Sequence, residues 1–550
     1  MFNKAKTMTF GLLTLISISA CGVSSSEWLS ESINSEISSE IPSEVTSEEL
    51  TIPLDYEFDD EVANTRGGAY YEIFVRSFAD SDGDSIGDLL GVASKMEYLN
   101  QLGVGGVWLM PIHPSPSYHG YDVDDYKQIN EDYGTLADFD QMIAAANNND
   151  IDVIIDLVLN HSSNTHPWFT EGFNNFKNGN YSEDDNSNKA NWYNFYWDSG
   201  QVKYEAGFGE WMPDLNLDNP LVREEIASIA KFWLDRGVAG FRLDAVTYFY
   251  TNDTQASIDF LAWFKDVVKQ ENEDAFIVGE AWREENTVGL YYRGIDSLFN
   301  FQAANTGGYI IDNITSRTGS NFAFLLANTN NKMQEINDDA RVATFLTNHD
   351  MDRSAQMYVM YIPERQKLAA STYLLSPGIP FMYYGEEIGL KGTRGSAMTD
   401  ANRRLPMIWQ RGTDPWRTDV PPGTTYPMEN QVREGAFDLL EEAFSLTNHY
   451  KKVLNVRNSY PWLIDARVDF VNVANNLVGA LKMESKDGLE SPITVLHNFD
   501  GNSVSLDLSR INNQQELFIA HDIFTSQTRA QINEETITLA PFSSVVLEER

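Results

Sequence analysis

Short apolar runs alternate with longer amphipathic stretches from Ala69 to about residue 455. The amphipathic stretches have helical periodicity, as in Leu221–Arg236, Ile258–Glu271 and Glu364–Leu375. Short buried strands that alternate with helices predict parallel βαβ units, and about eight such units predict an α/β fold of the (β/α)8 TIM barrel type. The predicted strands lie in the runs Tyr70–Val75, Val104–Met110, Val153–Leu159, Val238–Leu243, Phe276–Gly279, Ser297–Phe301, Val342–Leu346 and Ile379–Tyr384.

Two segments break this alternation. Residues 162–216, after the third predicted strand, are rich in Asn, Trp and Tyr and full of turn formers, so we expect an inserted subdomain there. Residues 453–550 instead predict a C-terminal antiparallel β domain, which leaves 65–161 and 217–452 for the barrel. The strands expected in that domain are Leu477–Met483, Ile493–Asn498, Ser503–Leu508, Leu517–Ala520 and Ser543–Leu547.

The first 21 residues have the pattern of an export signal. Lys4 and Lys6 precede an apolar run from Phe10 to Ile18 that is too short to span a bilayer. Small residues then precede Cys21, the single cysteine, which resembles a bacterial lipoprotein signal with cleavage before Cys21 and lipid on its sulfur; an ordinary secretory signal is the alternative. We therefore expect an exported protein, either secreted or held on the outer face of the membrane by that lipid.

Residues 22–64 are rich in Ser and Glu and have almost no aromatic side chains. Such a composition cannot bury enough apolar surface to offset the entropy of ordering, so we expect a flexible tether.

The charge balance excludes one class of partner. The chain has 39 basic and 81 acidic residues, a net charge of −42. A protein this acidic lacks the basic surface that nucleic acid requires, and it would not dock electrostatically on anionic lipid. A solvated acidic surface that maintains solubility is the simpler interpretation, and adaptation to high salt is the alternative.

Charged and polar residues gather where the predicted barrel strands end. Catalytic side chains in such barrels lie at the C-terminal ends of strands. Singly, each could cap a helix, form a structural ion pair or be a core histidine; together on one face they predict an active site. The residues at these ends are Asp156, Asn160 and His161, then Arg242 and Asp244, then Glu280, then His349 and Asp350.

Four segments that carry these residues resemble the signature regions of the α-amylase family of retaining glycoside hydrolases. They are DVIIDLVLNH (152–161), GFRLDAV (240–246), IVGEAW (277–282) and FLTNHD (345–350). The resemblance extends from about Ala69 to the C-terminus and implies a barrel enzyme that acts on an α-glucan.

The resemblance also implies a role for each matching residue. Asp244 would be the nucleophile, Glu280 the acid/base and Asp350 a third acid that grips the distorted sugar. Arg242 would keep Asp244 ionised, because a neighbouring cation lowers a carboxylate pKa. The remaining substrate-binding residues would be His161 and His349 as hydrogen-bonding partners of the sugar, Tyr121 as its aromatic platform, and Arg353 as a support of the site.

An acidic loop follows the first predicted strand. Its alternating carboxylates suit Ca²⁺, which takes six to eight oxygen ligands. The loop is not an EF-hand, because Ser85 replaces the required Gly; it resembles a calcium loop of some family members, and an acidic solvated turn is the alternative. The expected ligands are Asp80, Asp82, Asp84, Asp88 and the carbonyl oxygen of Ile86. Many relatives have another calcium site, which Asn160 matches, but Tyr248 stands where a histidine usually contributes.

Three features bear on specificity. Residues 212–216 (MPDLN) look intermediate between those of α-amylases and those of oligo-1,6-glucosidases with neopullulanases. Ala245 follows the nucleophile where α-1,6-specific relatives have Val, and Tyr118 replaces an Asp of exo-acting glucosidases, for which Arg404 would be the partner. We therefore expect endo-acting hydrolysis of α-1,4 bonds in starch-like glucans. The alternatives are a neopullulanase, a cyclomaltodextrinase, a 4-α-glucanotransferase or, at a distance, a non-catalytic surface glycan-binding protein.

Overall fold

The computed structural model describes residues 64–512 and 516–549. The predicted signal of residues 1–21 with Cys21, and almost all of the predicted tether, lie outside the described residues. Within the described ranges, no helix is both long and apolar enough to cross a membrane.

Eight parallel strands form the central sheet, in the order β10-β1-β2-β3-β6-β7-β8-β9. A parallel bridge between Phe345 and Phe381 joins the chain just after β9 to β10 and closes the barrel. Each predicted run contains one strand, although β3 and β9 begin one residue before their predicted runs. The predicted fold class is therefore confirmed. The strands are β1 (Tyr70–Ile73), β2 (Gly106–Leu109), β3 (Asp152–Leu157), β6 (Gly240–Leu243), β7 (Phe276–Gly279), β8 (Ser297–Phe299), β9 (Arg341–Ala343) and β10 (Phe381–Tyr383).

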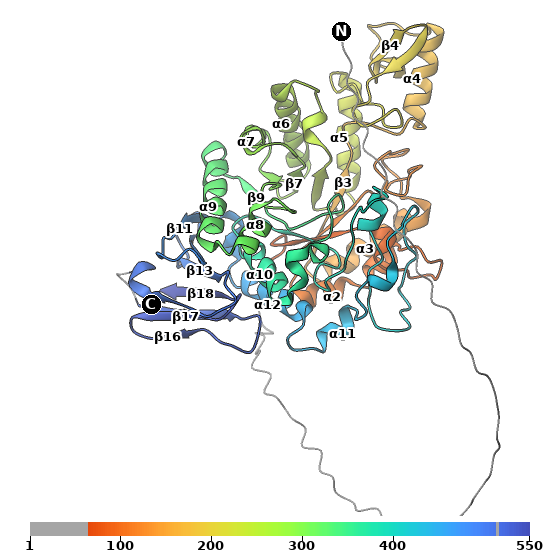
Figure 1. Cartoon of the computed structure of the whole chain (residues 1–550). Coiled ribbons are helices and arrows are strands. Elements are labelled where there is room, and N and C mark those ends of the chain that lie inside the picture. The colour runs from red at the N-terminus through yellow and green to blue at the C-terminus, as the bar shows by residue number, and fades with distance from the viewer. Residues whose placement is uncertain (1–63, 513–515, 550) are drawn as a thin grey trace, which may run out of the picture. The chain divides into compact units, whose positions relative to one another are not determined.

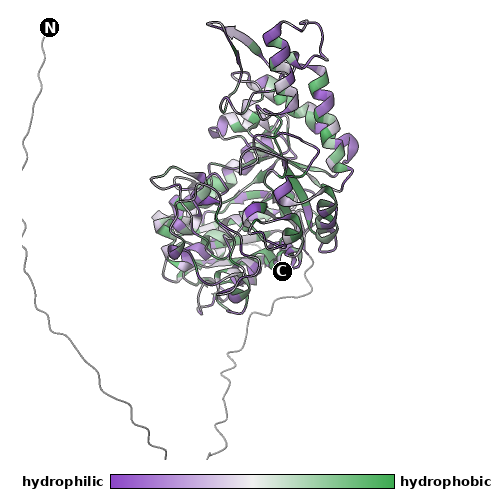
Figure 2. Ribbon diagram, turned by 90° about the vertical axis from the view of Figure 1, so that its right-hand side faces the viewer, coloured by the Kyte–Doolittle hydropathy of each residue, from purple (hydrophilic) through white to green (hydrophobic). Residues whose placement is uncertain are grey.

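Helices surround this sheet (Figure 1). Their ends follow capping chemistry: the Thr135 hydroxyl and Asp138 carboxylate form a capping box at the start of α3, and Asn219 caps α5 just before Pro220. Figure 2 shows apolar strands at the centre and helices with apolar and polar sides. The helices are α1 (Leu89–Ala93), α2 (Met96–Leu102), α3 (Leu136–Asn147), α5 (Pro220–Leu234), α6 (Thr254–Glu271), α7 (Glu285–Tyr291), α8 (Tyr309–Ser316), α9 (Gly319–Ile336), α10 (Pro363–Leu374), α11 (Ala436–Leu440) and α12 (Leu446–Asn458).

Aromatic side chains fill the inside of the barrel. Tyr70 stacks on Phe381 with ring centroids 5.0 Å apart, and Trp108 lies 5.4 Å from Phe299. Both pairs belong to one buried cluster. Because the interior is packed, a substrate can reach only the ends of the strands.

The segment between β3 and β6 contains α4 (Pro167–Asn178) and a hairpin of β4 (Phe195–Asp198) and β5 (Gln201–Tyr204). Its core uses aromatic residues: Trp192 and Tyr193 are buried, whereas Trp197 and Trp211 are 56% and 54% exposed. An isolated bridge between His161 and Asp214 ties the two ends of this segment together at the top of β3.

The C-terminal strands are antiparallel, as expected. One sheet has the order β11-β12-β13-β18-β15 and a second has the order β14-β17-β16. Helix α9 contacts β11 and β12, which joins this region to the barrel (Figure 1). The strands are β11 (Arg467–Phe470), β12 (Val478–Glu484), β13 (Ile493–Asn498), β14 (Val504–Asp507), β15 (Leu517–Ile523), β16 (Gln531–Ile532), β17 (Thr536–Leu539) and β18 (Ser544–Glu549).

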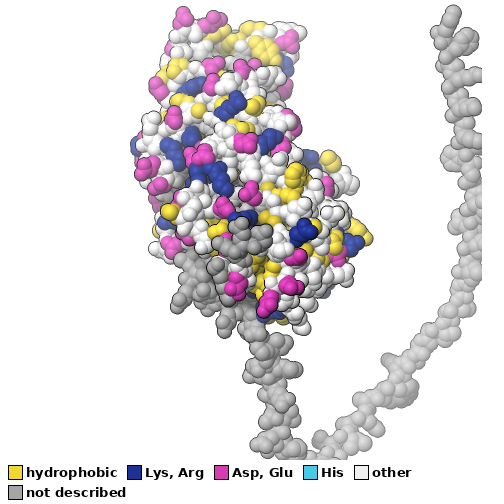
Figure 3. All heavy atoms as spheres, turned by 90° about the vertical axis from the view of Figure 1, so that its left-hand side faces the viewer, with side chains coloured by type: hydrophobic (Ala, Val, Ile, Leu, Met, Phe, Trp, Pro, Cys, Tyr) yellow, Lys and Arg dark blue, Asp and Glu magenta, His cyan; other side chains and the backbone are white. Residues whose placement is uncertain are grey.

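The surface does not segregate its charges on the face seen in Figure 3. Acidic and basic side chains lie among one another there instead of forming a patch of one sign. Side chains of both signs are therefore exposed to solvent on that face.

Candidate active site

Five charged side chains meet at the C-terminal end of the barrel because the strands are parallel. Asp156 and Arg242 lie near the ends of β3 and β6, and Asp244 and Glu280 directly follow β6 and β7. Asp350 lies in the loop after β9. The side chains of Asp244 and Glu280 are each 11% exposed, whereas that of Asp350 is 34% exposed. The predicted strand-end residues therefore form one site, and Asp350 is its most accessible acid.

The guanidinium of Arg242 is the hub of this site. Its Nη1 donates to Asp156 Oδ1 at 2.9 Å and to Asp244 Oδ1 at 2.8 Å, and its Nη2 donates to Glu280 Oε2 at 2.5 Å. Arg242 is fully buried, and one cation cannot neutralise three buried carboxylates. A buried cluster with excess negative charge favours protonation of at least one acid.

The environment identifies which carboxyl groups hold protons most readily. Burial raises the pKa of Glu280 to about 7, with the charges of Asp244 and Asp350 adding to the effect and Arg242 opposing it. Burial likewise raises the pKa of Asp156 to about 6 against Arg242. Burial also disfavours ionisation of Asp350, but His349 and Arg404 outweigh it and hold that pKa well below its usual range. Glu280, whose pKa is raised, therefore fits a proton donor. Asp350, whose pKa is lowered, fits a permanent anion.

His349 connects several of these groups. Its Nδ1 lies 2.5 Å from Glu72 Oε1, and its Nε2 lies 2.8 Å from the Tyr121 hydroxyl and 3.1 Å from Asp350 Oδ2. The Tyr121 ring stacks on the imidazole, and its hydroxyl donates to Asp156 Oδ2 at 3.0 Å. Tyr121 and His349 thus lie in the site, as expected.

Three residues support the site without having been assigned a catalytic or substrate-binding role from the sequence. Glu72 backs His349, Asp156 binds Arg242, and Arg404 donates from Nη2 to Asp350 Oδ1 at 2.9 Å. The sequence does indicate a special position for Glu72, because a carboxylate within the apolar run Tyr70–Val75 is expected to be buried and to need a partner.

His161 and Arg353 have different positions. His161 is buried beside the Phe208 ring, and burial lowers its pKa, so its ring is neutral. Its Nε2 is buried and makes none of the hydrogen bonds found among the described residues. Arg353 does not face the carboxylates: it donates to the carbonyl oxygens of Arg403 at 2.9 Å and Tyr384 at 2.6 Å. It supports the loop that carries Arg404.

The acidic loop after β1 gathers three of its four carboxylates. One oxygen each from Asp80, Asp82 and Asp88 lie within 4.8 Å of one another, the single such group of three among the described residues. Asp84 is outside this group and accepts from the Ile86 N–H at 2.7 Å. Asp80 accepts from the N–H groups of Asp82, Gly83 and Ser85, and a carboxylate has about four lone-pair sites. An all-oxygen donor set with lone pairs to spare fits a hard cation such as Ca²⁺.

Protein groups satisfy the position of the other family calcium site. Asn160 Nδ2 donates to Asp214 Oδ1 at 3.0 Å, and the Tyr248 ring packs against Phe208. An amide donor toward this carboxylate takes the place that a cation would need.

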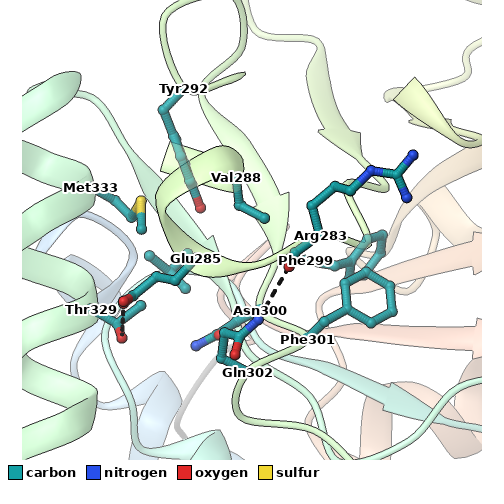
Figure 4. Close-up of a pocket in the computed structure, with 11 residues that line it drawn as sticks. Arg283, Glu285, Val288, Tyr292, Phe299, Asn300, Phe301, Gln302, Thr329 and Met333 are labelled. Carbon is teal, nitrogen blue, oxygen red and sulfur yellow. Dashed lines mark hydrogen bonds between the residues drawn. The ribbon is translucent and has the colours of Figure 1, made fainter. Parts of the chain in front are cut away.

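A pocket of about 20 Å³ lies beneath the loop that follows Glu280 (Figure 4). It has room for one water molecule and not for a sugar. In Figure 4 the Gln302 amide donates to the Arg283 carbonyl oxygen at 3.1 Å, and Thr329 donates to Glu285 at 2.8 Å. These bonds support the backbone that carries Glu280.

Residues 72–466 match the family model for the α-amylase catalytic domain, and residues 490–546 match that for the C-terminal domain of the α-amylase SusG.

The chain belongs to the α-amylase family.

Relatives within the family have more than one activity in their names. Alpha-amylase 3 of Dictyoglomus thermophilum is 35% identical over 88% of this chain and 93% of its own length. A 4-alpha-glucanotransferase of Thermotoga neapolitana is 28% identical over 80% of this chain and 98% of its own. Among solved structures, Amy13B of Eubacterium rectale has a TM-score of 0.82 and 35% identity, and covers 89% of this chain and 96% of its own. The protein is therefore an α-amylase family hydrolase acting on α-glucans.

Proposed function

We propose that this enzyme is an endo-acting α-amylase that cleaves α-1,4 bonds by a retaining double displacement. The observation that supports this most strongly is the sharing of the Arg242 guanidinium between Asp244 and Glu280. That sharing holds the two carboxyl groups close together, and retaining enzymes keep theirs about 5–5.5 Å apart.

In the first step, an Asp244 carboxylate oxygen attacks the anomeric carbon. The bond to the leaving glycosidic oxygen breaks, and Glu280 transfers its proton to that oxygen. Glu280 is suited to this task because burial raises its pKa to about 7. Arg242 neutralises the pair as charge moves from Asp244 to Glu280.

In the second step, Glu280 takes a proton from water, and the resulting oxygen attacks the anomeric carbon. The bond to Asp244 breaks, and the carboxylate returns to Arg242. Asp350 remains an anion throughout and is placed to hold sugar hydroxyls as positive charge develops on the ring. His161, which the family resemblance assigns to the same sugar, follows β3 at this end of the barrel.

Two contacts support an open cleft for internal bonds. Arg404, which would pair with an Asp in exo-acting glucosidases, instead pairs with Asp350 and lies over the Tyr118 ring at 5.8 Å. No acid is therefore present at residue 118 to grip a non-reducing end. Trp211 and Trp282, 54% and 47% exposed, offer stacking surfaces for further glucose units.

A 4-α-glucanotransferase is the second candidate, because similar relatives have that name. Chromatography of products from amylose over time separates the two. The proposal requires short maltooligosaccharides from the start, and long transfer products would support the transferase. Asp244→Asn should abolish hydrolysis, and an active variant would refute the mechanism.

Two further parts of the proposal concern calcium and location. Asp80, Asp82 and Asp88 would hold Ca²⁺, which would fix the loop after β1. Export with lipid on Cys21 is proposed from the sequence alone; incorporation of labelled palmitate that Cys21→Ala abolishes would support it.

A further inference from the structure

Glu72 lies directly behind His349, on the side away from the carboxylate cluster that binds Arg242. It is in the middle of β1, it is 2% exposed, and its Oε1 lies 2.5 Å from His349 Nδ1. The same oxygen lies 3.4 Å from the His349 backbone N–H. A buried carboxylate in a barrel strand needs such partners to offset its desolvation.

The hydrogen-bond directions determine how many protons the imidazole carries. When Asp156 is an anion it accepts the Tyr121 hydroxyl proton, and the Tyr121 oxygen then accepts from His349 Nε2. Asp350 Oδ2 also lies 3.1 Å from Nε2, an ion-pair contact for a protonated ring. His349 Nδ1 faces the Glu72 carboxylate, so both ring nitrogens donate.

We propose that Glu72 is a positioning residue that keeps His349 a cation, with Nδ1 donating to Glu72 on one side, Nε2 donating to Tyr121 on the other, and Asp350 as the ion-pair partner of the ring. This inference deepens the proposed function and rests on it. Its consequence is that the sugar platform and the third acid are both held in place by a carboxylate that does not touch substrate.

The charged groups around His349 agree with this state. Burial opposes a charged ring, but Asp350 and Glu72 outweigh it and raise the pKa of His349 to about 10. The other facing groups are the Tyr121 hydroxyl and Arg404, whose Nε donates to the His349 carbonyl oxygen at 3.2 Å. The positive ring in turn lowers the pKa of Asp350, Asp156 and Glu280.

Histidine-selective NMR of the whole protein tests the charge. The signal of His349 is the one that disappears in His349→Asn. It should show an imidazolium ring from pH 6 to about 9, because the pKa is about 10. A neutral ring at pH 7, including one that accepts a proton from a protonated Glu72, would overturn the inference.

Activity of Glu72→Gln gives a second readout. Removing one opposite charge should lower the pKa of His349 by about 1–3, so its cation titrates within the working range. The ratio of kcat/KM to that of the parent should be near one at pH 5.5 and should fall by pH 8.5, about fourfold for a pKa lowered by about 2 and about thirtyfold for a pKa lowered by about 3. Glu72→Asp, which retains the charge, should restore much of the loss at high pH.

Glu387→Gln is the matched control. Glu387 is also buried at this end of the barrel and accepts from the hydroxyls of Tyr71 and Tyr98 at 2.8 and 2.9 Å. Its substitution should leave the pH dependence of kcat/KM unchanged. If the ratio of kcat/KM between Glu72→Gln and the parent stayed constant with pH, the role of Glu72 would be merely structural and the inference would be overturned. The loss of hydrolysis in Asp244→Asn tests the proposed function separately from this result.

Discussion

The pH dependence of the first chemical step follows from the environment of Glu280. This acid must be protonated to donate to the leaving oxygen, and burial together with Asp244 and Asp350 raises its pKa to about 7. Because the protonated form is lost as pH rises, kcat/KM should fall on the alkaline side. One titrating proton leaves about half of the active form at pH 7, about a tenth at pH 8 and about a hundredth at pH 9.

The assay is hydrolysis of a chromogenic maltooligosaccharide below its KM, from pH 5.5 to 9.5. A maltosyl fluoride is the control substrate, since fluoride leaves without a proton. The alkaline decline should be present for the glycoside and absent for the fluoride. Equal declines for both substrates, or constant activity for the glycoside up to pH 9, would refute the assignment of Glu280 as the acid.

Two other predictions concern the hub and the acidic loop. Arg242→Met leaves three buried carboxylates without their cation, so urea denaturation should show that the free energy of unfolding falls by about 3–5 kcal/mol, and activity should be lost. The control Arg236→Met breaks a solvent-exposed pair with Asp140 and should lower the free energy of unfolding by at most about 1 kcal/mol. Equal losses in the two variants would contradict the central role of Arg242. Chelation with EGTA should lower the thermal midpoint of the parent, and saturating Ca²⁺ should restore it by stabilising the native state, by about 2.7 kcal/mol at a hundredfold excess over Kd. Asp80→Asn should remove this response and Asp132→Asn, at an exposed position outside the loop, should retain it; a parent insensitive to both reagents would exclude the calcium proposal.

The barrel could be predicted from sequence because each strand is a separate apolar run. Runs such as Val153–Leu159 and Val238–Leu243 are buried on both faces and bounded by polar segments, so their positions needed no knowledge of the fold. The strands that escaped prediction have a different character. They are β4, β5, β11, β16 and β17, which are two to four residues long and have exposed or half-exposed residues, so they present no continuous buried run.

Only the site residues that lie at the ends of barrel strands could be predicted from the sequence. Asp244 and Glu280 directly follow strands, so parallel topology alone brings them together. The contact between Glu72 and His349 joins residues 277 positions apart, and it depends on the closure of the barrel between β9 and β10. The direction of Arg353 likewise depends on the loop that carries Arg403, which has no regular pattern.

The central claim is that Asp244 becomes covalently bound to the sugar. The most direct measurement uses a fluorinated glycosyl donor that slows the second step, followed by peptide mass spectrometry of the trapped enzyme. The account predicts one added glycosyl group on the peptide that contains residues 240–246, at Asp244, and none in Asp244→Asn. A label on another residue, or turnover that inverts the anomeric configuration without any labelled enzyme, would contradict it.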